Sequence, residues 1–151
     1  VVVLDTGSSD GTVPVAEGLG ARAHLADPPI VPFHFAVARN RAAALASNDW
    51  IVWVDADERF LPGAVDAIRE AVVRAAEDGT TGFRLWFRFV PGESEYFRFV
   101  VFDRRHWFWR NRVHNVLVSE TADRSKLRDL NGAVLAITPM QSDESQISVF
   151  F

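Results

Sequence analysis

Three carboxylates directly follow an apolar run in the segment NDWIVWVDADERF, residues 48–60. Like charges at this spacing repel one another, and burial of the run's end adds a desolvation cost. Residues two apart in an extended chain point to the same side, so Asp55 and Asp57 suit a divalent cation such as Mg²⁺ or Mn²⁺. The competing interpretation is that Asp57 and Glu58 lie near the positive N-terminus of the next helix.

The elements that must position these carboxylates alternate along the first 78 residues. The apolar runs predict strands at 1–4, 21–26 and 50–54, the last a central strand, and helices at about 13–19, 35–47 and from Pro62 to about residue 78. In the third helix, apolar residues recur at the spacing of a helix face. The order strand–helix, three times over, predicts a parallel, doubly wound sheet with right-handed crossovers.

After residue 78 the pattern changes to strands without intervening helices. The segments 82–90 and 96–102 alternate apolar residues with arginine and are joined by PGESE, which predicts an antiparallel pair. A further strand is predicted at 116–119. From Thr121 onward the sequence is polar and irregular, apart from AVLAI at 133–137 and ISVFF at the C-terminus.

Ligands of open α/β sheets bind beyond the carboxyl ends of the strands. Asp5 ends the first predicted strand, so we expect Asp5, Asp55 and Asp57 to lie at one edge of the sheet. The loop that follows, DTGSSDGT, is not a P-loop, because no G-K-[ST] sequence completes it. Without further context, this loop could equally cap a helix.

The composition excludes several classes of protein. A formal charge of −4 argues against non-specific binding to nucleic acid. The absence of cysteine excludes disulfides, thiol catalysis and Cys-zinc sites, and it fits a reducing cytoplasm. No apolar run reaches 18 residues and no signal peptide is visible, so we expect a cytoplasmic protein, with peripheral association at the inner face of the membrane left open.

Three segments occur in a characteristic order: VVVLDTGSSDGT, FAVARNRAAALASNDWIVWVDADERF and WFWRNRVHNVL. Together they resemble the nucleotide-sugar glycosyltransferases of family 2, above all the members whose motifs run VVDTGSTDGT, ARN, DADE and VHE. The resemblance covers about residues 1–120 and leaves 121–151 as an irregular C-terminal extension. It implies an α/β fold of GT-A type, a Rossmann-like three-layer sandwich whose mostly parallel sheet has an antiparallel second half.

The resemblance also implies roles for individual residues. Asp5 matches the aspartate that binds the nucleobase, with Gly7 in the same loop, and Arg39 matches a residue lining the nucleotide pocket. Asp55 matches the aspartate that faces the ribose, and Asp57 the one that ligates the Mn²⁺ or Mg²⁺ holding the diphosphate. The implied reaction is a metal-dependent, inverting transfer of a sugar from a nucleoside-diphosphate sugar to a hydroxyl of a glycan, lipid-linked or protein acceptor.

The usual catalytic base is missing at its matched position. In related sequences the glutamate of VHE takes the acceptor's proton, whereas this chain has Asn115, which cannot accept a proton at neutral pH. His114 is a candidate base or additional metal ligand, since an unperturbed histidine titrates near pH 6.5. Asp103 and Glu120 are candidates that could reach the acceptor from a neighbouring strand. The aromatic and basic segment 107–112 fits either sugar stacking or core packing.

Two observations support a catalytically inactive, GT-A-like binding module as the alternative. One is Asn115. The other is that the family's first strand, which normally precedes VVVLD, is absent from this chain, although QISVFF at 146–151 has the apolar character of such a strand. A phosphatase of the haloacid-dehalogenase type is disfavoured, because its D-x-D continues with Thr or Val where this chain has Glu58 and Arg59.

Overall fold

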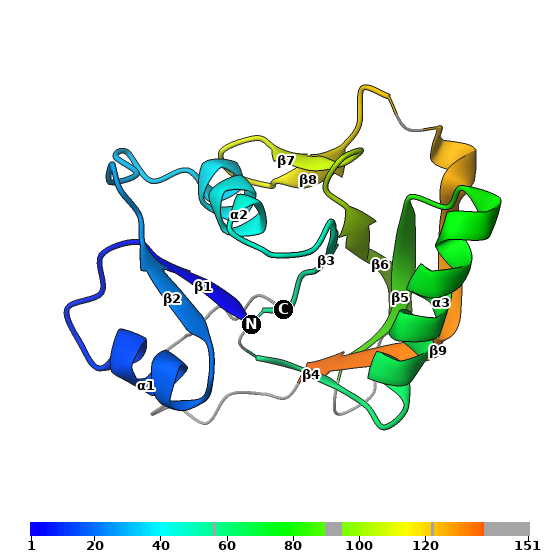
Figure 1. Cartoon of the computed structure of the whole chain (residues 1–151), viewed down its shortest axis with the longest axis horizontal. Helices are drawn as coiled ribbons and strands as arrows, with labels where there is room; N and C mark the ends of the chain where they lie inside the picture. Colours follow the sequence, from blue (N-terminus) through cyan, green and yellow to red (C-terminus); the bar gives the residue numbers. More distant parts are fainter. Residues whose placement is uncertain (56, 90–94, 122, 138–151) are drawn as a thin grey trace.

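The computed structural model describes residues 1–55, 57–89, 95–121 and 123–137 (Figure 1). These residues form a mixed α/β structure, which confirms the predicted fold class and is consistent with a GT-A-like, Rossmann-type fold. Its elements, in chain order, are β1 (Val2–Asp5), α1 (Thr12–Gly18), β2 (Arg22–Leu25), α2 (Phe35–Ala44), β3 (Trp50–Val52), β4 (Glu58–Phe60), α3 (Ala64–Asp78), β5 (Gly82–Phe89), β6 (Glu95–Asp103), β7 (Phe108–Arg110), β8 (Val116–Val118), the short 3₁₀ helix η1 (Arg124–Lys126) and β9 (Leu127–Ile137).

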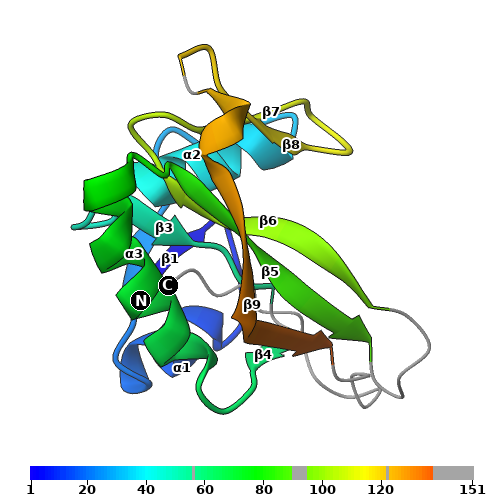
Figure 2. The same cartoon turned by 90° about the vertical axis from the view of Figure 1, so that its right-hand side faces the viewer.

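A five-stranded sheet in the order β3-β6-β5-β9-β4 supports most of the core. Strands β5 and β6 of this sheet pair antiparallel, as the alternating sequence predicted. Helix α3 packs beside β9, as both views show (Figure 2). The helix turns a row of small and branched side chains toward the sheet, and the fully buried ones are Ala64, Ile68, Ala71 and Ala75. This spacing of three and four residues is the reason the segment forms a one-sided helix.

A second, smaller sheet consists of β1 and β2, which are parallel. Helix α1 contacts β2, and helix α2 lies between β1 and the antiparallel β7–β8 hairpin (Figure 1). His34 caps α2, since its Nδ1 accepts a hydrogen bond from the backbone N–H of Val37 at 3.3 Å. The cap satisfies one of the free N–H groups of the first turn and fixes where α2 begins.

The third predicted strand has a different position in the sheet from the one expected. Residues 50–54 were expected to form the central strand of a parallel sheet, but β3 is an edge strand that pairs antiparallel with β6. Trp53 extends this pairing, because its N–H donates to the Val100 carbonyl at 2.8 Å. A continuous apolar run indicates that a strand is buried, but it carries no information on which strand pairs with it or in which direction.

Two further expectations are corrected by the strands around β9. Glu58 belongs to β4 and not to a helix N-terminus, since α3 begins six residues later with Gly63 as its N-cap. The tail expected to be irregular before residue 133 forms η1 and the first half of β9, which pairs with β5. The end of β9 pairs with both β5 and β4. The apolar C-terminal segment QISVFF, considered as a substitute for the family's first strand, lies outside the described residues.

Candidate functional site

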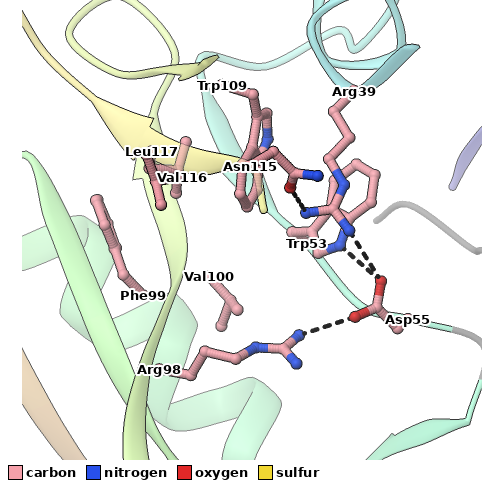
Figure 3. Close-up of a pocket in the computed structure, with 10 residues that line it drawn as sticks. All are labelled: Arg39, Trp53, Asp55, Arg98, Phe99, Val100, Trp109, Asn115, Val116 and Leu117. Atoms are coloured by element: carbon pink, nitrogen blue, oxygen red, sulfur yellow. Dashed lines mark hydrogen bonds and ion pairs between the residues drawn. The ribbon is translucent and has the colours of Figure 1, made fainter. Parts of the chain in front are cut away.

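A cavity of about 360 Å³ opens beside the end of β3, between β6 and the β7–β8 hairpin (Figure 3). Its wall combines aromatic and aliphatic side chains with two arginines, one carboxylate and one amide. The lining residues are Arg39, Trp53, Asp55, Arg98, Phe99, Val100, Trp109, Asn115, Val116 and Leu117. A mainly apolar cavity with a few convergent polar groups has the general character of a small-molecule site.

Asp55 is the carboxylate of this wall, and three side chains fix its direction. The indole Nε1 of Trp53 donates to Oδ1 at 2.9 Å. Arg39 lies 3.5 Å from the same oxygen, and Arg98 lies 3.4 Å from Oδ2. The side chain keeps about a third of its surface exposed. Asp55 is therefore held between two guanidinium groups while still facing the cavity (Figure 3).

Arg39 reaches the cavity from α2 and is enclosed by two indole rings. Its guanidinium carbon lies 4.1 Å from the ring centroid of Trp53 and 4.5 Å from that of Trp109. One branch donates to Asn115 Oδ1 at 2.5 Å. Burial lowers the pKa of Arg39 from its usual value, although the neighbouring Asp55 acts in the opposite direction. The planar cation is thus held by cation–π contacts and by two polar partners.

Arg98 and Glu58 form the most buried ion pair of the site. The two terminal nitrogens of Arg98 contact the two carboxylate oxygens of Glu58, at 2.5 and 2.9 Å. The Glu58 side chain is only 1% exposed, and it also accepts a hydrogen bond from the Asp55 backbone N–H at 3.0 Å. Burial raises the pKa of Glu58 above its usual value, against the effect of this hydrogen bond and of Arg98. The guanidinium carbon of Arg98 also lies 4.6 Å from the ring centroid of Phe87.

Asn40 positions one wall of the cavity from its place next to Arg39. Its amide makes two hydrogen bonds to the backbone of Trp109, accepting from the N–H at 2.8 Å and donating to the carbonyl at 2.9 Å. The Asn40 amide thus makes the two hydrogen bonds that a neighbouring strand would make to Trp109, and it connects α2 to β7. Trp109 lines the cavity as a result, while Trp107 is buried in the core and donates to Thr81 Oγ1.

The structure brings some of the predicted site residues together and places others elsewhere. Arg39, Asp55 and Asn115 share the cavity wall. Asp5 is buried at the end of β1, where its carboxylate accepts from the Ser8 N–H at 3.1 and 3.3 Å, and it does not line this cavity. Gly7 follows with φ +119°, a conformation that favours glycine. Asp57 is half-buried next to the site, outside the lining.

The three remaining candidates for a proton acceptor also lie outside the lining. Glu120 is exposed and accepts a hydrogen bond from Arg110 at 3.1 Å. His114 is exposed beside Asn115, with φ +50°. Asp103 is buried at the end of β6 and bound by the Arg105 side chain at 2.6–3.1 Å. Burial opposes its ionisation, but the hydrogen bonds from Arg105 outweigh this, so the pKa of Asp103 lies below its usual value.

Sequence reasoning missed Arg98, Trp53 and Asn40. Arg98 lies in the alternating segment YFRFVVF, whose pattern indicates an arginine on the solvent face. Its contact with Glu58 depends on how β4 and β6 come together in the sheet, which no local pattern reveals. Asn40 is part of the quoted ARN motif, in a segment predicted to be helical. Its side-chain amide has both a donor and an acceptor, which was a signal that it could bind another part of the chain.

The described carboxylates and histidines do not assemble into a ready-made metal cage: no group of three potential ligands occurs among these residues. Likewise, no helix in the described part of the chain is long and apolar enough to span a bilayer.

Comparison with known proteins identifies the class to which this fold and site belong. The family model for glycosyl transferase family 2 matches residues 1–125, so the chain belongs to that family and is a glycosyltransferase domain. A TPR repeat-containing protein of Synechococcus elongatus is 41% identical over 69 residues, which are 46% of this chain. The chain spans only 16% of the length of that relative.

Proposed function

We propose that this chain transfers a sugar from a nucleoside-diphosphate donor to an acceptor hydroxyl, with inversion at the anomeric carbon. The observation that carries the proposal is the meeting of Arg39, Asp55 and Asn115 around one cavity. These residues come from three separate motifs, and Arg39 contacts Asn115 across 76 positions of the chain. Aromatic faces and fixed polar groups in one cavity suit a sugar and its anionic leaving group. The acceptor class is a glycan, lipid-linked or protein hydroxyl.

A divalent cation, Mn²⁺ or Mg²⁺, is part of the proposal. Mg²⁺ usually binds through one or two carboxylates and takes further ligands from substrate phosphates. Asp57 and Asp55 fit this mode, which needs no cage of three protein groups. When bound, the cation would offset the charge that develops on the leaving diphosphate. Asp5 and Gly7, at the end of β1, would contact the nucleobase.

The acceptor hydroxyl has to lose a proton as it attacks, so one residue near the site must act as a base. Asn115 cannot take the proton, but it holds Arg39 in place. Asp103 is enclosed and bound by Arg105, so its lone pairs are already occupied. We assign the base to His114, which is exposed next to Asn115 and has an imidazole nitrogen that can accept a proton. The same imidazole is a candidate ligand for the cation.

Isothermal titration of the protein with UDP, GDP and dTDP, each with and without Mn²⁺, tests the proposal. We expect at least one nucleotide to bind, and to bind more tightly with Mn²⁺. Asp57→Asn should remove the Mn²⁺ dependence. Asp129→Asn is the matched control, since Asp129 pairs with Arg84 on the sheet, outside the cavity lining, and should leave binding unchanged. Absence of Mn²⁺-dependent binding with all three nucleotides would contradict the proposal.

A binding module without catalysis is the second candidate, and Asn115 is the observation that favours it. Such a module would bind a nucleotide but release no nucleoside diphosphate from a sugar donor. In that case Asn115→Glu should create transferase or donor-hydrolysing activity, because it places a carboxylate at the position of the family's base. The new carboxylate would lie beside Arg39, which keeps it ionised. Failure of this variant to turn over, with nucleotide binding intact, would point either to a different base, such as His114, or to a true binding module.

A further inference from the structure

Arg98 contacts two carboxylates: Asp55, in the wall of the cavity, and Glu58, outside its lining. Its contact with Glu58 is short and uses both branches, at 2.5 and 2.9 Å, whereas its contact with Asp55 Oδ2 is longer, at 3.4 Å. Glu58 is almost completely buried, while Asp55 faces the cavity. The position of Arg98 is therefore set mainly by Glu58, and its contact with Asp55 is the weaker of the two.

This geometry bears on how Asp55 can bind a cation. Oδ1 is directed by Trp53 and Arg39, and Oδ2 is the oxygen that Arg98 approaches. A cation on Oδ2 would meet the positive charge of Arg98 at close range, so the arginine must withdraw toward Glu58. Glu58 can receive it, because two of its contacts with Arg98 are already made.

We propose that Arg98 is a positioning residue that sets the cation affinity of Asp55, with Glu58 as the anchor that holds its guanidinium back. Glu58, the third carboxylate of DADE, then acts through Arg98 and does not ligate the cation. The inference rests on the proposed function, since it concerns the cation that would bind with the diphosphate. A charge at such a distance changes the proton affinity of a carboxylate about tenfold or more, and an effect of the same order is expected for Mn²⁺.

The first test is the affinity for Mn²⁺, with and without UDP, measured from the free Mn²⁺ signal in electron paramagnetic resonance. Arg98→Lys keeps the positive charge beside Glu58 but loses the second branch that reaches Asp55. We expect it to bind Mn²⁺ about tenfold more tightly than the wild type. A purely long-range effect of charge predicts no change for this variant. Arg84→Lys is the matched control, because Arg84 forms an equally short pair with Asp129 on the same sheet.

The second test is a double-mutant cycle between the two partners. Glu58→Gln releases Arg98 from its anchor, so Arg98 should close on Asp55 and weaken Mn²⁺ binding about tenfold. In the Arg98→Lys background, where the side chain no longer contacts Asp55, Glu58→Gln should change the Mn²⁺ affinity much less. Additive effects would mean that each side chain acts only through its charge, which would overturn the proposal. Circular dichroism and urea unfolding show whether each variant is folded.

The outcomes separate this inference from the proposed function. If the wild type binds a nucleotide with Mn²⁺ but Arg98→Lys leaves the Mn²⁺ affinity unchanged or weakens it, the inference fails and the proposed function stands. If the wild type shows no Mn²⁺-dependent binding while Arg98→Lys gains it, the inference is supported and the wild-type site is held closed by Arg98. If no folded form binds Mn²⁺, both fail.

Discussion

Replacing Arg39 by methionine tests whether the cavity is built around this one side chain. Methionine keeps an unbranched apolar stem but removes the charge, the planar group and the hydrogen bond to Asn115. Arg39 is 17% exposed and lies between Trp53 and Trp109, so the change falls on the cavity wall and not on the outer surface.

The expected loss of stability can be worked out from the contacts. A hydrogen bond from a charged donor contributes about 1.5–3 kcal/mol, and each cation–π contact at a partly exposed site about 0.5–1 kcal/mol. The ion pair with Asp55 is long, at 3.5 Å, and adds little. Against these stands the cost of burying a charge, which the lowered pKa of Arg39 reflects. We expect Arg39→Met to reduce the free energy of unfolding by about 2 kcal/mol.

Urea unfolding followed by tryptophan fluorescence measures this loss. With a denaturant dependence of about 2 kcal/mol per molar urea, the midpoint should fall by about 1 M. The fluorescence of the folded state should also change, because Trp53 and Trp109 lose the cation between them. Arg69→Met is the matched control, since Arg69 is 76% exposed on α3 and pairs only loosely with Asp66. A midpoint for Arg39→Met that stays within the range of this control would refute the reasoning.

Two further substitutions test other parts of the structure. Asp103→Asn should lower the free energy of unfolding by about 2 kcal/mol at pH 7, because the charged hydrogen bonds with Arg105 are lost. The folded-state pKa of Asp103 lies below its usual value, so its stabilisation is present at pH 7 and is lost as the pH falls through the folded-state pKa. Urea unfolding at pH 7 and pH 3 should show a smaller difference from wild type at the lower pH, and a constant difference would contradict this. Gly82→Ala should cost about 1–3 kcal/mol, because its Cβ would lie 2.5 Å from Cε2 of Phe99, a cavity residue packed on Trp107. Gly132→Ala, with 3.4 Å to its nearest neighbour, is the control for that urea titration, and equal costs would argue against the steric reason.

The parts of the fold that sequence predicted well are those decided by local periodicity. Helix α3 follows from apolar residues spaced three and four apart, although Val65 is 40% exposed and its neighbour Ala64 is buried in the core instead. The β5–β6 pair follows from alternation with a turn-like segment between. In both cases neighbours along the chain determine the structure.

The parts that sequence could not predict depend on partners far apart in the chain. β3 was expected at the centre of a parallel sheet, but its pairing was decided by β6, some 50 positions away. Glu58 was considered for the N-terminus of a helix, and its burial follows from the pairing of β4 with β9 and from its contact with Arg98. Within the candidate site, the motifs named Arg39, Asp55 and Asn115, but their direct contacts emerged only from the assembled fold.

The contact between Arg39 and Asn115 makes the cavity a property of the whole domain, since its walls come from segments spread between residues 39 and 117 of the chain. A molecule that fits this cavity can bind the native chain but not the denatured one. By mass action, a ligand at one hundred times its dissociation constant would add about 2.7 kcal/mol to the unfolding free energy. Raised melting temperatures in a panel of sugar nucleotides would therefore identify the donor without any assay of turnover.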